Sequence, residues 1–231
     1  MQVMDERERQ CRIAASRAGR RAAAAGDSTA WFDPLYRAAR EADAPADIPW
    51  VDQRPNRFLM QWLDRAMPAP CRACVVGCGL GDDAEELARR GFNVTAFDIS
   101  PTAIDWCRER HAATAVDYAV ADFNNLPAAW RGAFDLVVEV YNVQALPLAE
   151  RAISSAALSS LVARGGRLVA VCRGRSDEES DPKGPPWPFS PKEMALFATE
   201  GMTEESFEII DDPDDEGVVR FLGVYRRVPA D

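Results

Sequence analysis

The chain has 231 residues, of which 47% are hydrophobic and 28% are charged. This composition predicts a globular protein with one substantial core and excludes collagen-like, mucin-like and wholly disordered chains. Aspartate and glutamate outnumber lysine and arginine by 37 to 27, so the formal net charge is −10, and we expect neither nucleic acid nor an anionic membrane as a partner.

The N-terminal part, residues 1–70, is predicted to be a helical extension that acts as a lid. Residues 1–21 contain no apolar segment of the signal-peptide kind, and the chain has no apolar run near the roughly 20 residues of a membrane span, so we expect a cytoplasmic protein. Apolar spacing and helix-breaking residues predict three helices, over residues 1–25, 29–42 and 56–66. Three prolines predict an ordered loop or lid over residues 43–55.

From residue 71 to residue 231 the pattern predicts a second unit in which strands and helices alternate. Apolar runs predict strands over residues 73–76, 92–97, 116–121, 134–140 and 167–172. Capping and helix-ending residues predict helices over residues 82–90, 101–111 and 148–163. This order is typical of an α/β fold with a parallel sheet and helices on both faces.

The C-terminal part is predicted to add a helix and two strands. Residues 173–189 are rich in glycine, proline and charge and predict a mobile segment, and a capping box at Ser190 and Glu193 starts a helix to about residue 200. Strands are predicted over residues 207–210 and 218–225, joined by an acidic turn that lacks the ligand spacing of a calcium loop. We therefore expect a doubly wound, Rossmann-like, mostly parallel seven-stranded sheet with an antiparallel C-terminal hairpin and an N-terminal helical lid.

Six cysteines are present, and two of them, Cys71 and Cys74, form a single C-x-x-C. A structural zinc site would need a second pair or histidine partners, and His111 is the only histidine. We therefore expect no metal, and we interpret the cysteines as reduced thiols in and around the first strand of the sheet. His111 ends a predicted helix, where an imidazolium complements the helix dipole, so a catalytic role is not favoured.

A glycine-rich loop follows the first strand of the predicted sheet and opens a helix. Its glycines are Gly77, Gly79 and Gly81, whereas the dinucleotide fingerprint would need a glycine at position 82. Asp82 and Asp83 stand there instead and would oppose a pyrophosphate at the helix N-terminus. A cofactor without phosphates and with positive charge is favoured, and S-adenosylmethionine meets both conditions. The alternative is a tight strand-to-helix turn that binds nothing.

Acidic residues also end the next two predicted strands. Asp98 can accept hydrogen bonds from both hydroxyls of a ribose, or it can simply cap the following helix. Asp122 can accept from the exocyclic amine of an adenine, and Phe123 offers a flat face to the ring. Their alternative roles are a turn aspartate and a core phenylalanine.

Three segments resemble the class I S-adenosylmethionine-dependent methyltransferases in the order and spacing of their motifs. They are residues 74–83, 97–104 and 120–123, and the resemblance covers about residues 72–227. It implies that Gly77, Gly79 and Gly81 line the methionine and ribose part of the cofactor, that Asp98 binds the ribose and that Ile99 flanks the adenine.

The same resemblance extends the cofactor site on both sides. It implies that Asp122 and Phe123 hold the adenine and that Trp31 and Trp50 close over the methionine end, although both tryptophans could instead be core aromatics. Segments outside the core resemble the branch of thiopurine and tellurite-resistance methyltransferases, which act on small molecules. Those segments are Trp31 with Tyr36, residues 48–50 and residues 184–189, whereas residues 138–142 depart from that branch.

The acceptor end of the site is expected at the carboxyl end of the fourth strand, where ligands bind in open α/β sheets. Glu139 is the candidate for orienting the acceptor or acting as a weak general base, and a strand-end or helix-capping carboxylate is the alternative. Aromatic residues in the segments that would cover this edge predict an apolar or aromatic acceptor.

Three functions remain open from the sequence. We expect methyl transfer from S-adenosylmethionine, leaving S-adenosylhomocysteine, to the thiol, hydroxyl or amine of a small acceptor. A sensor that binds S-adenosylmethionine or adenosine without catalysis is the first alternative. A nicotinamide-dependent oxidoreductase is the second, and the two carboxylates after the glycine loop disfavour it. The sequence does not determine an oligomeric state.

Overall fold

The protein is built on one seven-stranded sheet in the order β3-β2-β1-β4-β5-β7-β6. The computed structural model describes residues 6–179, 182, 184–199 and 201–228. The strands are β1 (Arg72–Val76), β2 (Asn93–Asp98), β3 (Asp117–Val120), β4 (Phe134–Val140), β5 (Val162–Gly174), β6 (Met202–Asp211) and β7 (Val219–Arg227). Strands β1 to β5 pair in parallel, whereas β7 runs antiparallel to β5 and to β6. The predicted fold is confirmed.

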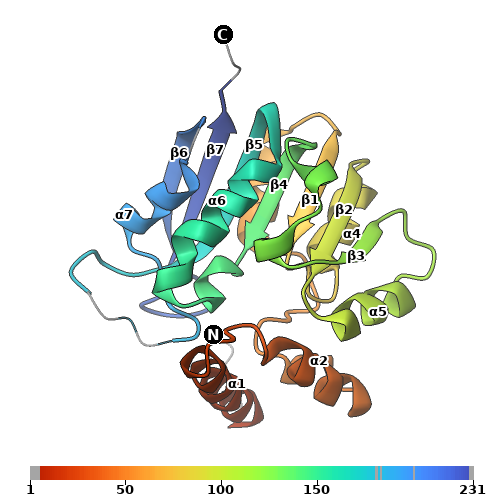
Figure 1. Cartoon of the computed structure of the whole chain (residues 1–231), viewed down its shortest axis with the longest axis vertical. Coiled ribbons are helices and arrows are strands. Elements are labelled where there is room, and N and C mark those ends of the chain that lie inside the picture. Colours follow the sequence, from red (N-terminus) through yellow and green to blue (C-terminus); the bar gives the residue numbers. More distant parts are fainter. Residues whose placement is uncertain (1–5, 180–181, 183, 200, 229–231) are drawn as a thin grey trace.

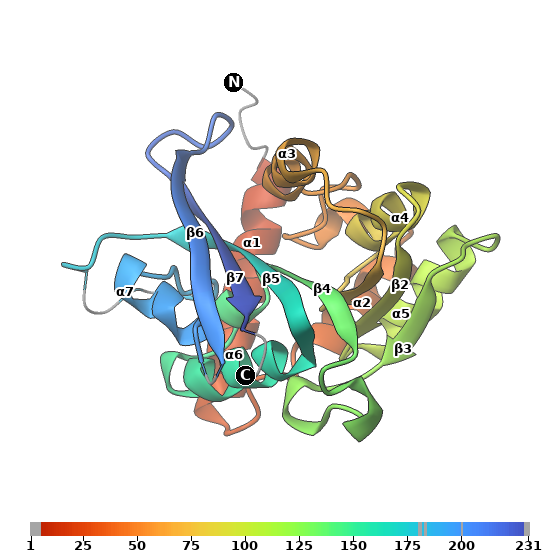
Figure 2. The same ribbon diagram turned by 90° about the horizontal axis from the view of Figure 1, so that it is seen from above.

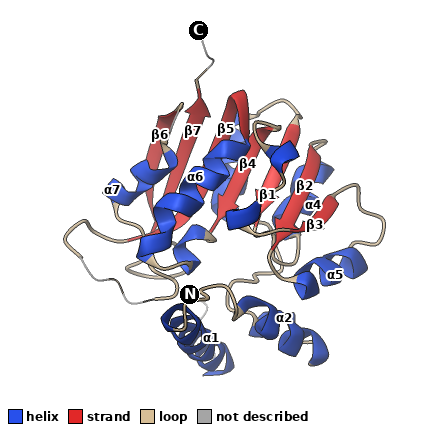
Figure 3. Cartoon of the chain, in the orientation of Figure 1, coloured by secondary structure: helices blue, strands red, loops and turns tan. Residues whose placement is uncertain are grey.

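Helices cover both faces of this sheet (Figures 2 and 3). The helices are α1 (Glu6–Ala24), α2 (Phe32–Glu41), α3 (Arg57–Ala66), α4 (Asp82–Arg89), α5 (Pro101–Arg110), α6 (Arg151–Leu161) and α7 (Pro191–Met194). One apolar cluster joins α3, α4 and α5 to one face of the sheet, and a second joins α6 and the turn after α7 to the other face. Side chains of the central strands alternate between the two clusters, because successive residues of a strand point to opposite faces.

The first two helices lie apart from these layers. Figure 1 shows α1 and α2 beyond the ends of the parallel strands, on the side where those strands have their carboxyl ends. Helix α3 instead packs against the sheet through Phe58, Leu59, Trp62 and Leu63, which belong to the first apolar cluster. The division into units 1–70 and 71–231 stays a prediction. Within residues 6–70, α1, α2 and the loop after them lie at the carboxyl edge, whereas α3 does not.

Several predicted element boundaries differ from the structure, and strand pairing explains two of the larger differences. Helix α6 ends at Leu161, because Val162 pairs with Phe134 and already belongs to β5. Strand β6 starts at Met202, since pairing with β7 extends through residues 203–206, which are exposed and polar. The helix after Ser190 has one turn, Pro191–Met194, and continues as a 3-10 turn over Ala195–Phe197.

Among the described residues, none of the helices combines the length and the apolar character that crossing a membrane requires.

Candidate functional site

The glycine loop takes a backbone conformation that suits glycine. All three glycines have positive φ, with values of +52° at Gly77, +56° at Gly79 and +90° at Gly81, where other residues are strained. A Cβ at Gly77 would lie 1.9 Å from the Asn142 side-chain oxygen, and a Cβ at Gly79 would lie 3.2 Å from the Tyr36 hydroxyl. The loop backbone therefore lies directly against side chains from the turn after β4 and from α2, and a larger residue would displace them.

Asp98 ties this loop to the end of β2. Its Oδ2 accepts a hydrogen bond from the backbone N–H of Gly79 at 3.0 Å, and its Oδ1 accepts one from Ser100 at 2.9 Å. The side chain is buried, and burial raises the pKa of its carboxyl group to about 6 despite these bonds. The backbone of Ile99 also hydrogen-bonds to this carboxylate. A carboxylate has about four lone-pair sites, so capacity for a further donor remains.

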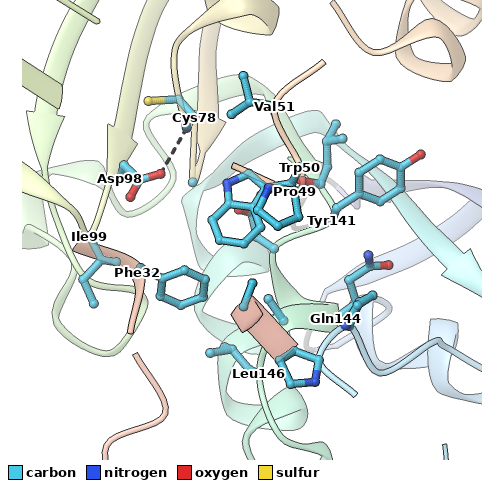
Figure 4. Close-up of a pocket in the computed structure, with 18 of the residues that line it drawn as sticks. Phe32, Pro49, Trp50, Val51, Cys78, Asp98, Ile99, Tyr141, Gln144 and Leu146 are labelled. Carbon is cyan, nitrogen blue, oxygen red and sulfur yellow. Dashed lines mark hydrogen bonds between the residues drawn. The ribbon is translucent and has the colours of Figure 1, made fainter. Parts of the chain in front are cut away.

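A cavity of about 640 Å³ opens beside the glycine loop at the carboxyl edge of the sheet. This volume is in the range of small-molecule sites. Eight of the predicted cofactor residues line it: Trp31, Trp50, Gly77, Gly79, Asp98, Ile99, Asp122 and Phe123. Figure 4 shows Asp98 and Ile99 on one side of the cavity and Tyr141 and Gln144 on the opposite side, with Trp50 between them.

Aromatic side chains from α2 and from the loop after it form one wall of the cavity. The Trp50 ring lies edge-on to Trp31, Phe32 and Tyr36, with centroid distances of 5.4, 5.8 and 6.0 Å. The indole N–H of Trp50 donates to the Tyr36 hydroxyl at 2.8 Å, so the indole is held in place by a hydrogen bond as well as by ring contacts. Trp31 is buried, whereas Trp50 is partly exposed to the cavity.

The segment of residues 173–189 contributes fewer aromatic side chains to the cavity than its sequence predicts. Pro185 and Pro186 line the cavity, but Trp187 and Phe189 are not among its lining residues. Phe189 is fully buried and stacks on Phe197, with ring centroids 5.8 Å apart. Residues 180, 181 and 183 of the predicted mobile segment lie outside the described residues.

Gly81 has a packing role in the structure. It is the N-cap of α4 and is not among the residues that line the cavity. A Cβ there would lie 2.3 Å from the Tyr118 hydroxyl and 3.3 Å from the Cys107 sulfur. The absence of a side chain at this position lets α4 start close to β3 and α5. A role for Gly81 toward the cofactor stays a prediction.

Glu139 has the second of the two roles considered for it. Its side chain is fully buried and is not among the residues that line the cavity. Its Oε1 accepts hydrogen bonds from the backbone N–H groups of Asn142 at 2.7 Å and Val143 at 2.9 Å, and its Oε2 lies 3.7 Å from the Cys172 thiol. Burial raises the pKa of this carboxyl group to about 7. In this structure the carboxylate caps the turn after β4 and does not line the cavity, and its role toward an acceptor stays a prediction.

Three further carboxylates line the cavity near the start of α4: Asp52, Asp82 and Asp83. Asp83 accepts a hydrogen bond from the backbone N–H of Asn56 at 2.6 Å, and burial raises the pKa of its carboxyl group to about 6, with Asp82 and Asp52 adding to the rise. Asp82 lies 3.3 Å from Arg110. This corner favours a cationic group and opposes a phosphate.

His111 and the cysteines do not form a second site among the described residues. His111 caps the C-terminus of α5, with its Nε2 3.3 Å from the carbonyl oxygen of Leu80. Over the described part of the chain, no group of three or more histidine, cysteine or acidic side chains could hold a metal ion.

The sequence analysis missed several polar residues of the cavity, including Arg12, Asn56, Arg173 and Arg220. Arg12 belongs to a helix whose composition is typical of a solvent-exposed surface, and Arg173 and Arg220 are far apart in the sequence. Arg173 alone could have been predicted as a cavity residue, because it follows the predicted buried strand of residues 167–172 at the carboxyl edge of the sheet, where ligands bind.

Comparison with known proteins agrees with this geometry. Residues 74–166 match the family model described as a methyltransferase domain. A curated relative, the ubiquinone biosynthesis O-methyltransferase of Xanthomonas axonopodis pv. citri (strain 306), is 35% identical over 114 residues, which cover 48% of this chain and 47% of that protein. The chain spans about half the length of the curated relatives it matches.

Solved structures share the fold at low identity. The 1,6-didemethyltoxoflavin-N1-methyltransferase of Burkholderia thailandensis, solved with S-adenosylhomocysteine, is 17% identical, with a TM-score of 0.65 over 85% of each chain. The N-methyltransferase NodS of Bradyrhizobium japonicum WM9, also solved with S-adenosylhomocysteine, is 21% identical, with a TM-score of 0.60 over 78% of this chain and 91% of that one.

The chain therefore shares its fold with methyltransferase structures solved with S-adenosylhomocysteine. The match of residues 74–166 to the methyltransferase-domain model agrees with the motif resemblance noted in the sequence. The narrower resemblance to the thiopurine and tellurite-resistance branch stays a prediction.

Proposed function

We propose that the protein transfers a methyl group from S-adenosylmethionine to a thiol, hydroxyl or amine of a small apolar or aromatic acceptor. The observation that carries this proposal is the continuity of the cavity. The glycine loop and Asp98 line one side of it, and Trp50, Tyr141 and Gln144 line the rest (Figure 4). A nucleoside cofactor and an acceptor would therefore share one space that is largely screened from water.

The residues on the Asp98 side fit the parts of this cofactor. The free lone pairs of Asp98 suit ribose hydroxyls, while Ile99 and Phe123 offer apolar surface to an adenine. The corner of Asp52 and Asp83 suits the ammonium of the methionine part. S-adenosylmethionine supplies a methyl group on a sulfonium, which is already an activated leaving group.

The chain's own contribution would be orientation and exclusion of water. Glu139 would act as a positioning residue, because its carboxylate holds the turn that carries Asn142. The Asn142 amide donates to the carbonyl oxygens of Val76 at 2.8 Å and Val140 at 3.0 Å, and so connects that turn to the glycine loop. Holding two reactants in line accounts for much of the rate in such a transfer.

Binding and transfer assays test this proposal in two stages. Calorimetry should show binding of S-adenosylmethionine and S-adenosylhomocysteine and none of NAD. Transfer of a labelled methyl group should then be measured with a panel of aromatic thiols, phenols and amines. Binding without transfer to any acceptor would favour the sensor function instead. Binding of NAD in place of S-adenosylhomocysteine would contradict the cofactor assignment.

A further inference from the structure

Two arginines lie directly opposite each other beside the cavity, where β5 ends and the antiparallel β7 begins. Arg173 pairs with Arg220 in the antiparallel register of these strands, so both side chains leave the same face of the sheet. Like charges in directly opposed positions destabilise a sheet. Both arginines line the cavity, and Arg12 of α1 lines it too. Arg12 and Arg220 are close enough to Arg173 to lower the pKa of its guanidinium electrostatically, in addition to the larger effect of burial.

The acids that pair with these three arginines are not among the residues that line the cavity. Arg220 donates from Nε to Asp212 at 2.7 Å, and Arg12 contacts Glu8 at 2.8 Å. Arg173 reaches only Asp215, at 3.8 Å, which is too long for a hydrogen bond. Because the arginines line the cavity and these acids do not, the remaining guanidinium donors are available to a ligand there.

Partial burial makes this arrangement costly without a ligand. The side chains of Arg173 and Arg220 are only 32% and 15% exposed. Within the described chain, the Arg173 guanidinium has the long contact to Asp215 and no side-chain hydrogen bond. A partly desolvated guanidinium whose donors lack acceptors is unfavourable, and a bound anion would relieve that cost.

An aromatic surface lies beside these charges. The Arg220 guanidinium stands 5.2 Å from the centroid of the Tyr141 ring. Tyr141 has a φ of +65°, a strained conformation for a bulky residue and one that is found at functional sites. The Gln144 side-chain oxygen accepts a hydrogen bond from the backbone N–H of Arg173 at 2.6 Å, so the end of β5 is fixed against the turn after β4.

From this arrangement we propose that the acceptor is an aromatic carboxylic acid whose carboxylate binds between Arg173 and Arg220, with Arg12 closing the site from α1. A guanidinium pair matches the planar, singly charged carboxylate. Asp52 and Asp83 line the same cavity and would oppose a dianionic phosphate. This inference rests on the proposed function, since it names the acceptor class of the same cavity.

Paired probes that differ only in charge test this site. Benzoate and phenylacetate would be titrated by calorimetry against benzamide and phenylacetamide, with and without saturating S-adenosylhomocysteine. Each acid should bind the wild-type protein about tenfold or more tightly than its amide, the size expected for a hydrogen-bonded charge. Arg173→Gln and Arg220→Gln should each bring this ratio close to one, and Arg173→Lys should retain part of it.

Two controls separate this effect from a general loss of charge or of folding. Arg131→Gln removes an exposed arginine that is not among the cavity residues and should leave the ratio unchanged. Arg12→Gln removes a cavity charge from the exposed side of α1 without touching the sheet, and it should lower the ratio even if the sheet variants do not fold.

The outcomes for the two proposals are distinct. The carboxylate site is overturned if the acids bind the wild-type protein no better than the amides do. It is also overturned if the preference for acids survives in Arg12→Gln, Arg173→Gln and Arg220→Gln. If S-adenosylhomocysteine does not bind but the acid preference depends on Arg173, the methyl-transfer proposal fails and the anion site stands. If S-adenosylhomocysteine binds and the wild-type protein shows no preference for acids, the carboxylate site fails and the cofactor part of the methyl-transfer proposal stands.

Discussion

Buried carboxylates determine the local geometry of this cavity residue by residue. Asp98 accepts hydrogen bonds from Gly79 and Ser100 and lines the cavity, whereas Glu139 accepts from Asn142 and Val143 and does not. Burial raises the pKa of both groups, to about 6 and about 7. The same physical cause therefore acts on a residue that lines the cavity and on one that holds the turn after β4.

Asp98→Asn should weaken S-adenosylhomocysteine binding by about tenfold or more, because it removes the charge that strengthens hydrogen bonds to ribose hydroxyls. In the wild-type protein the affinity should rise between pH 5 and pH 7, as the Asp98 carboxyl ionises. Calorimetry checks both effects, with Asp105→Asn on the exposed face of α5 as the matched control. Unchanged affinity in a folded Asp98 variant would exclude this residue from the cofactor site.

Glu139→Gln should change how stability depends on pH. In the wild-type protein the folded-state pKa lies above the ordinary value of 4.5, so the stability contributed by this group is present below pH 4.5 and is lost as the pH rises through about 7. The Gln variant lacks this loss. Relative to wild type, its free energy of unfolding should increase by about 3 kcal/mol between pH 4.5 and pH 8.

Urea unfolding at several pH values measures this difference, with Glu216→Gln in the exposed hairpin turn as the control. Methyl transfer by the Glu139 variant should fall by no more than a few-fold. If transfer is abolished while the stability profile stays that of wild type, Glu139 is a general base and not a positioning residue.

At the scale of elements, the strand-loop-helix unit of β1 and α4 depends on close packing. The loop lies between Asn142 on one side and Tyr36 on the other, and α4 begins against Tyr118. The Tyr118 hydroxyl donates to Glu85 of α4 at 2.7 Å, which fixes the position of that hydroxyl. The register of the helix against β3 therefore depends on a glycine that does not line the cavity.

Gly81→Ala should destabilise the protein by about 1–3 kcal/mol, because the new methyl group combines left-handed strain with a clash against the Tyr118 hydroxyl. Tyr118→Phe in the same chain should restore part of that loss. Gly26 has a φ of +84° and open space around it, so Gly26→Ala should show the destabilisation caused by backbone strain alone. Thermal unfolding measures all four proteins. A loss at Gly81 no larger than that at Gly26 would contradict the packing role.

At the scale of the whole molecule, α1 and α2 lie beyond the carboxyl edge of the sheet (Figure 1), and both helices contribute residues to the lining of the cavity. Arg7 of α1 forms an ion pair of 2.7 Å with Asp47 in the loop after α2. A Cβ at Gly19 would lie 2.4 Å from Pro185 and 3.1 Å from Trp31. Helix α1 therefore packs directly on the segment that approaches the cavity from the other side.

S-adenosylhomocysteine should slow hydrogen exchange in residues 43–55 and 173–189, while β1 and β4 stay protected with and without it. Gly19→Ala should reduce this ligand effect, because its methyl group would push α1 away from Pro185. Arg17→Ala on the exposed face of α1 is the control. If hydrogen exchange in both segments is as slow without the ligand as with it, these segments are fixed parts of the core.

Much of the fold could be predicted from local patterns. The apolar runs of β1, β2, β4 and β5 and the capping residues of α4 and α5 determine their own elements, because period and capping are properties of neighbouring residues. The glycine loop and Asp98 were also identified from the sequence, since both follow predicted strands whose ends share one edge of the sheet.

Tertiary structure decided what local patterns do not contain. Strand pairing extended β5 and β6 beyond their apolar runs. Burial decided that Glu139 caps a turn, because a carboxylate at a strand end can face either a cavity or the core. The packing of α1 over the sheet, and the register that sets Arg173 opposite Arg220, brought together charges from distant parts of the chain. These contacts depend on which surfaces meet after folding, and no spacing along the sequence encodes that.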